Sequence, residues 1–125
     1  MAKVVGLGGV FLKCQKLEET RKWFQDNLGT SGEWGAMFPF KNDDPEGFSM
    51  LSAFKADTDY FAPSQFPFMI NLRVDDLDAL VAKLETNGVE ILGRQDEPYG
   101  RFAWIMDPEG VKIELWQQIG PAPDV

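Results

Sequence analysis

The chain has 125 residues, of which 12 are Lys or Arg, 20 are Asp or Glu, one is cysteine and none is histidine. With 44% hydrophobic and 26% charged residues, it has the composition of one globular domain and is too apolar to be disordered. The absence of histidine excludes Ser-His-Asp and Cys-His nucleophile systems, imidazole proton transfer and His-ligated metal sites.

Charge and hydropathy exclude further classes of partner. The net charge of −8 argues against nucleic acid, because phosphate binding needs a concentrated basic surface. No apolar run approaches membrane-spanning length, and the apolar stretch at 4–12 contains three glycines and lacks a cleavage site, so we expect neither a membrane partner nor a signal peptide. A single cysteine cannot form an internal disulfide, which predicts a reducing, cytoplasmic location.

The first half of the chain predicts a strand, a helix and further strands. Over residues 10–14, the side chains of Val10, Leu12 and Cys14 alternate with those of Phe11 and Lys13, and this period of two is typical of a half-buried strand. Apolar side chains then follow helical spacing from Leu17 to Leu28, with Gly29 in place to end the helix. Asp-Pro-Glu-Gly at 44–47 predicts a tight turn that leads into an apolar strand at 48–54.

The second half repeats this order. Apolar and polar side chains alternate over residues 70–74, which predicts a strand 60 residues after its counterpart at 10–14. Apolar helical spacing follows, from an N-cap at Asp75 or Asp76 to Gly88. Asp-Pro-Glu-Gly recurs at 107–110, 63 residues after its first copy, before an apolar strand at 111–116. We therefore expect one domain with these parts: module one at about 4–54, a linker at about 55–68, module two at about 69–117 and a tail at 118–125.

The linker is rich in Pro, Asp and aromatic residues, among them Tyr60 and Phe61. The simpler interpretation, which we favour, is a connection between the modules. The alternative is a flap over a binding surface, or a contact between two copies of the chain.

The stretch Tyr-Gly-Arg-Phe-Ala-Trp-Ile-Met-Asp-Pro-Glu-Gly at 99–110, followed by Ile-Glu-Leu at 113–115, resembles the closing strands of the vicinal oxygen chelate superfamily. Residues 23–29 and 72–77 are also similar to that family of glyoxalases, bleomycin-resistance proteins and extradiol dioxygenases. The resemblance covers about residues 4–117. It implies an α+β fold in which two tandem βαβββ modules form a cup-shaped, eight-stranded mixed sheet around a ligand cavity, and it implies a homodimer.

In active members of that family, four side chains hold a divalent metal. The equivalent positions here are Gly9, Leu51, Met69 and Glu114. Glycine and leucine offer no donor, and a thioether is a soft ligand, so we expect no metal and no other cofactor. Glu114 is then the only candidate catalytic residue. The alternative is a metal-dependent lyase, isomerase or dioxygenase with a non-standard site around Glu114.

The alternation of the strands predicts which side chains would share the cavity with Glu114. Besides Trp104, the predicted ligand-binding residues are Phe11, Lys13, Asn71, Arg73, Lys112, Glu114 and Trp116. This polar and aromatic set predicts a small ligand with a carboxylate or similar acceptor, anchored by Arg73 and stacked on the aromatic rings.

Two observations weigh on that prediction. The net charge would suit a cationic antibiotic such as bleomycin, but three cations facing one cavity fit such a ligand poorly. Alternatively, Glu114 forms an ordinary ion pair with Arg73 or Lys112, and nothing binds there.

Overall fold

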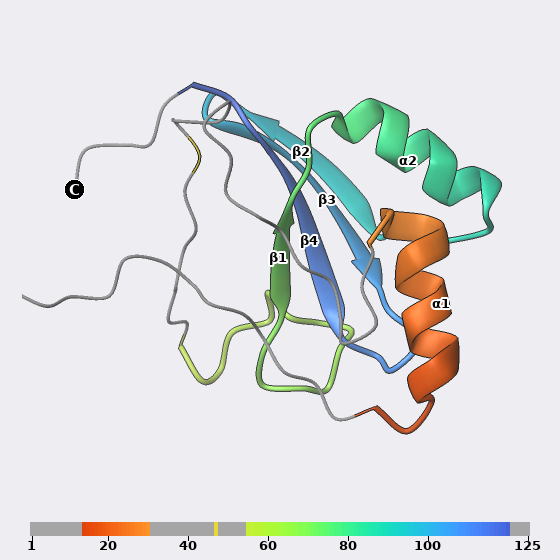
Figure 1. Ribbon diagram of the computed structural model, residues 1–125. Coiled ribbons are helices and arrows are strands. Elements are labelled where there is room, and N and C mark those ends of the chain that lie inside the picture. The colour runs from red at the N-terminus through yellow and green to blue at the C-terminus, as the bar shows by residue number, and fades with distance from the viewer. Residues whose placement is uncertain (1–13, 31–46, 48–54, 121–125) are drawn as a thin grey trace, which may run out of the picture.

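The computed structural model describes residues 14–30, 47 and 55–120, and these contain two helices and four strands (Figure 1). In chain order the elements are α1 (Leu17–Leu28), β1 (Ile70–Arg73), α2 (Leu77–Thr86), β2 (Gly93–Glu97), β3 (Gly100–Met106) and β4 (Lys112–Gln118). The second half is therefore a βαβββ unit, as the sequence predicts. The strands predicted at 10–14 and 48–54 lie outside the described residues, apart from Cys14, so the eight-stranded cup and the two-module division stay predictions.

The four described strands form one mixed sheet in the order β1-β4-β3-β2. β1 runs parallel to β4, whereas β4 pairs antiparallel with β3 and β3 pairs antiparallel with β2. Both helices lie on the same side of this sheet (Figure 1). This arrangement is the mixed α+β architecture that the sequence predicts for this half, and it leaves the other side of the sheet without a described helix.

Local sequence signals place the end of α1 and the start of α2. Gly29 adopts φ 66°, the left-handed conformation that ends α1. At the start of α2, the Asp76 side chain accepts a hydrogen bond from the Ala79 backbone N–H at 3.1 Å. A second orphan donor, the Leu77 N–H, is satisfied at 2.8 Å by the Gln117 side chain of β4, which ties the helix to the sheet.

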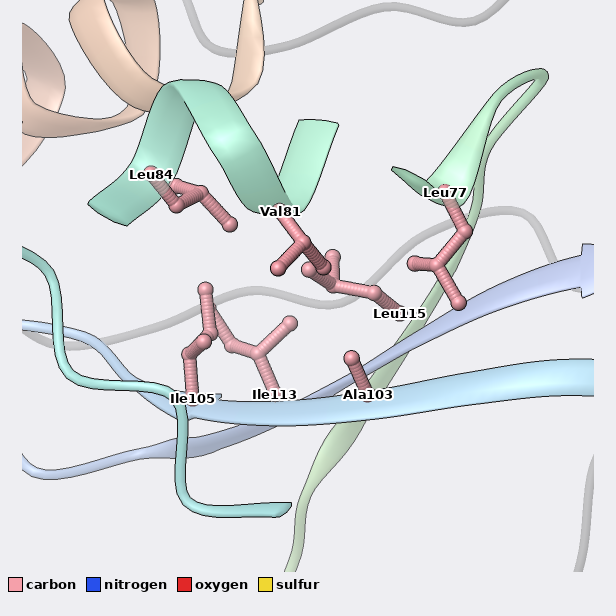
Figure 2. Close-up of a cluster of buried hydrophobic side chains, with 7 residues drawn as sticks. All are labelled: Leu77, Val81, Leu84, Ala103, Ile105, Ile113 and Leu115. Carbon is pink, nitrogen blue, oxygen red and sulfur yellow. The ribbon is translucent and has the colours of Figure 1, made fainter. Parts of the chain in front are cut away.

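The core lies between α2 and the sheet (Figure 2). Its buried side chains are Leu77, Val81, Leu84, Ala103, Ile105, Ile113 and Leu115. The residues from β3 and β4 alternate along their strands, while those from α2 recur at helical spacing, so each element turns one apolar face toward the other. Burial of this apolar surface is the main favourable contribution to the fold here.

The turn at Asp107–Gly110 links β3 to β4 and reaches back to α1. The buried Asp107 carboxylate accepts 2.9 Å hydrogen bonds from the backbone N–H groups of Glu109 and Val111, and Gly110 takes φ 89°. The Glu109 side chain accepts a 2.6 Å hydrogen bond from the Lys16 N–H just before α1. The predicted turn is thus confirmed, and it also fixes the start of the first helix. Neither described helix is long and apolar enough to cross a membrane.

Candidate functional site

The side of the sheet that faces away from the helices carries a cluster of polar and aromatic side chains, which we call the polar face. Its members are Asn71, Arg73, Phe102, Trp104, Lys112, Glu114 and Trp116. Asn71 and Trp104 lie beside Glu114 in the sheet, and Arg73 and Phe102 lie beside Trp116. The six predicted binding residues from β1, β3 and β4 thus share one face, and alternation predicts this for all of them except Trp104. Ligand binding there remains a prediction, and Phe11 and Lys13 lie outside the described residues.

Glu114 is the centre of a hydrogen-bond network. Its Oε1 accepts a bond from Asn71 Nδ2 at 2.7 Å, and its Oε2 accepts one from Trp104 Nε1 at 2.9 Å. The Tyr60 hydroxyl also donates to Oε2. Three neutral donors from β1, β3 and the linker segment (residues 55–68) therefore hold one carboxylate, in charge-assisted bonds that are stronger than bonds between neutral groups.

Tyr60 is the site residue that the sequence interpretation missed. The linker segment forms turns rather than helix or strand, and it lies at the end of the sheet where β1 and β4 begin (Figure 1). Besides the Glu114 contact, the Tyr60 carbonyl accepts a 2.5 Å bond from Lys112 Nζ, and Ser64 Oγ donates to the Gly110 carbonyl at 2.6 Å. The segment thus contacts the polar face. Its aromatic content was the available signal, but no periodicity places a side chain of a turn.

Burial and the neighbouring carboxylate shape the chemistry of the Tyr60 phenol. Burial raises the pKa of Tyr60 above its ordinary value of 10.0, and the hydrogen bond to Glu114 and the negative charge of Glu114 raise it further. The phenol therefore keeps its proton and acts as a donor. The Tyr60 ring also meets the Trp104 ring edge to face, with centroids 6.3 Å apart and planes at 89°.

Lys112 places a positive charge beside this aromatic pair. Its Nζ lies 5.1 Å from the centroid of the Tyr60 ring and 5.9 Å from that of Trp104. Desolvation lowers the pKa of Lys112, while the charge of Glu114 works in the opposite direction. No ion pair joins Glu114 to Lys112 or Arg73 in the described part of the chain. The ordinary ion pair considered from the sequence is therefore replaced by neutral donors to Glu114.

Arg73 and Trp116 form the other end of the polar face. The Arg73 guanidinium lies 5.8 Å from the centroid of the Trp116 ring, and its Nη2 donates to Gln118 Oε1 at 3.0 Å. The Trp116 ring is only 5% exposed and packs against Gly100, where a Cβ atom would stand 2.6 Å from Trp116 Nε1. Glycine is thus required at position 100 for this close approach.

Aromatic rings connect the two ends. Phe102 and Trp104 lie nearly parallel, with centroids 6.4 Å apart and planes at 13°. Tyr99 meets Phe102 edge to face at 6.0 Å and is 64% exposed. The polar face therefore combines apolar stacking area with charged groups at both ends, a mixture that is typical of small-molecule sites.

The donor set around Glu114 does not fit a divalent metal ion. Tyr60, Asn71 and Trp104 all direct N–H or O–H groups at the carboxylate, and an indole N–H has no lone pair to offer a metal. Met69 is half-buried and supplies a thioether, while Gly9 and Leu51 lie outside the described residues. Across residues 14–30, 47 and 55–120, no three His, Cys, Asp or Glu side chains come together as a metal site.

A separate hollow of about 330 Å³ lies away from the polar face. It is bordered by Trp23 and Asn27 of α1, by Asn87 at the end of α2, and by Asp107 after β3. Asn87 Nδ2 donates to Asn27 Oδ1 at 3.1 Å, and Asp107 is committed to its turn. These polar groups are thus used to join the two helices and to hold the turn, so the polar face is the better candidate.

Comparisons with known proteins agree with the fold. The family model of a glyoxalase-like domain matches residues 9–116. The uncharacterized protein YaeR of Escherichia coli (strain K12) is 43% identical over 47 residues, which span only 36% of each chain. Among the solved structures that are similar over most of their length, two illustrate the range of identity.

The first is TnmS3, an antibiotic binding protein from Streptomyces sp. CB03234, which is 26% identical with a TM-score of 0.53. The similarity covers 84% of this chain and 88% of TnmS3. The second is the fosfomycin resistance protein FosX from Listeria monocytogenes, with a TM-score of 0.60 over 94% of this chain and 96% of FosX. At 13% identity, FosX is evidence for the fold alone.

Proposed function

Because the chain belongs to the family of glyoxalase-like domains, we propose that it is a binding protein of the bleomycin-resistance type, which holds a small molecule on the polar face without a metal ion. The similarity to the antibiotic binding protein TnmS3 supports this class of function. Phe11 and Lys13 would add to the site from the first half of the chain, and the whole would enclose a polar and aromatic cavity.

The observation that carries the proposal is the environment of Glu114. The three neutral donors from Tyr60, Asn71 and Trp104 compensate its charge. Lys112 lies against the Tyr60 and Trp104 rings and Arg73 lies against the Trp116 ring, and within the described residues neither cation forms an ion pair with Glu114. A partly desolvated cation over an aromatic surface favours a planar ligand that carries a carboxylate or another acceptor. In this proposal Arg73 is the anchor and the partly exposed Trp104 ring supplies stacking area, while the buried Trp116 ring supports the Arg73 guanidinium.

The competing function is that of a metal-dependent lyase, isomerase or dioxygenase around Glu114. Such an enzyme would need Glu114 to exchange its three donors for a metal and to recruit ligands from elsewhere. Metal analysis of the purified protein separates the two functions. The binding proposal predicts no stoichiometric metal, and one equivalent of bound manganese, nickel, zinc or iron that disappears in Glu114→Gln would overturn it.

Calorimetric titration with benzoate tests the ligand class. We expect Arg73→Gln to weaken benzoate binding by about tenfold to a hundredfold, the effect of losing one charge-assisted contact. The matched control is Arg21→Gln, because Arg21 lies on α1 in an exposed pair with Glu18. Equal affinity for benzoate in Arg73→Gln and Arg21→Gln would contradict the proposed anchor.

The single cysteine supports a cytoplasmic location and the family resemblance supports a homodimer, and both are part of the proposal. Light scattering of the purified protein tests the assembly, and a monomeric mass at micromolar concentration would overturn it.

A further inference from the structure

The Tyr60 side chain lies on the polar face in the manner of a bound ligand. We propose that Tyr60 occupies, from within the chain, a binding site for phenols, and that a free phenol displaces it. This inference rests on the proposed function of the polar face as a small-molecule site, and it names a ligand class for the Glu114 end of that face.

Each part of the Tyr60 side chain meets a group suited to a phenol. The hydroxyl donates to Glu114 Oε2, the ring meets Trp104 edge to face, and the Lys112 ammonium lies 5.1 Å from the ring centroid. A carboxylate recognises the O–H donor, the indole gives the ring an aromatic wall, and the cation is attracted to the ring face. A free phenol can make all three interactions, whereas toluene lacks the hydroxyl that Glu114 recognises.

The attachment of Tyr60 can be broken without breaking the sheet. The linker segment is held internally by local turn bonds, such as Ala62 N–H to the Asp59 carbonyl at 3.0 Å and Ser64 N–H to the Phe61 carbonyl at 3.0 Å. The Tyr60 ring is partly exposed, unlike the fully buried side chains under α2. Ser64, bonded to the Gly110 carbonyl, anchors the segment four residues further on. Tyr60 can therefore leave Glu114 while the segment stays attached at Ser64.

The same contacts predict selectivity at this end of the face. Glu114 carries a negative charge, so it favours a neutral hydroxyl donor and repels a carboxylate placed beside it. Arg73 lies two residues beyond Asn71, the residue of β1 that pairs with Glu114, and two residues of a strand span about 7 Å. An acceptor on the ligand would instead lie toward Arg73. The two ends of the polar face thus select different groups.

A chemical rescue experiment tests this inference with p-cresol, which reproduces the tyrosine side chain. We expect p-cresol to raise the melting temperature of Tyr60→Ala, and to bind it about tenfold to a hundredfold more tightly than wild type, in which Tyr60 competes for the site. Toluene should have little effect. The matched control is Tyr99→Ala, because Tyr99 is the other tyrosine of the chain and is largely exposed.

Tyr60→Phe keeps the ring and removes only the hydroxyl, so it replaces Tyr60→Ala in this experiment if Tyr60→Ala does not fold. It should bind p-cresol with an affinity between those of wild type and Tyr60→Ala. If toluene stabilises Tyr60→Ala as well as p-cresol does, or if Tyr99→Ala responds equally, the phenol site is overturned. That result is distinguishable from failure of the proposed function, because the proposed function is tested separately by comparing benzoate binding in wild type and in Arg73→Gln.

Discussion

The two faces of the same sheet differ in how they are held. On β4, Ile113 and Leu115 point toward α2 and are fully buried, whereas Lys112 and Glu114 point the other way and remain partly exposed. The helix side is built from non-directional apolar contacts, while the polar face is built from directional hydrogen bonds between strands and to the linker segment. The helix side therefore stabilises the fold, while the polar face carries the groups to which we assign the proposed binding.

The largest expected effect comes from the helix side. Ile113→Ala removes a fully buried side chain from the core, and we expect it to lower the free energy of unfolding by about 2–5 kcal/mol. Its neighbour on the opposite face, Lys112→Ala, should cost only about 1 kcal/mol, from the bond to the Tyr60 carbonyl. Urea unfolding measures both, and equal losses would break the distinction between the faces.

A glycine pair tests packing on the polar face. Gly100→Ala would place a Cβ atom 2.6 Å from Trp116 Nε1, so we expect a loss of about 1–3 kcal/mol from overpacking. The matched control is Gly93→Ala, where the nearest atom would be Trp104 Cε3 at 3.6 Å, an ordinary contact. If both substitutions leave the urea midpoint unchanged, the close packing of Trp116 is wrong.

The attachment of the linker segment should contribute less. Tyr60→Phe removes the hydroxyl donor to Glu114, and we expect it to lower the free energy of unfolding by about 1 kcal/mol, since the bond is partly exposed. Tyr99→Phe is the control, because an exposed hydroxyl should contribute almost nothing. Similar stabilities for the two variants would show that Tyr60 is not held by Glu114.

The smallest expected effect is a dependence of the free energy of unfolding on pH in the alkaline range. The pKa of Tyr60 is raised in the folded state, so the folded protein keeps a proton that the unfolded chain releases above pH 10.0. The contribution of the protonated Tyr60 phenol to the free energy of unfolding is fully present below pH 10.0 and is lost as the pH rises through the pKa of Tyr60 in the folded state. Lys112 acts in the opposite direction, because its pKa is lowered, so wild type must be compared with Tyr60→Phe.

Phenolate absorbance measures this pH dependence directly. Wild type should show a component that ionises above the ordinary tyrosine value, and that component should be absent in Tyr60→Phe. In Glu114→Gln it should move to lower pH, since the carboxylate charge contributes to the shift. A titration identical in wild type and Glu114→Gln would contradict the contact between Tyr60 and Glu114.

These two regions also differ in how far the sequence predicts them. The helix side follows from periodicity, because Leu77, Val81 and Leu84 recur at helical spacing and Ile113 and Leu115 alternate along a strand. The same alternation brings Asn71 and Glu114 to one face, which the register confirms. Tyr60 escaped prediction because a turn has no period, so its position depends on contacts 54 residues away along the chain. The partner of a carboxylate likewise depends on distances that a sequence does not contain.

The most direct test of the binding proposal follows the indole N–H signals of the tryptophans in a heteronuclear NMR titration with benzoate. Trp104 and Trp116 lie on the polar face, whereas Trp23 borders the hollow beside α1 and serves as an internal control. The account predicts that the Trp104 and Trp116 signals shift and saturate together while the Trp23 signal stays in place. Shifts confined to Trp23, or no saturable shift at all, would contradict it.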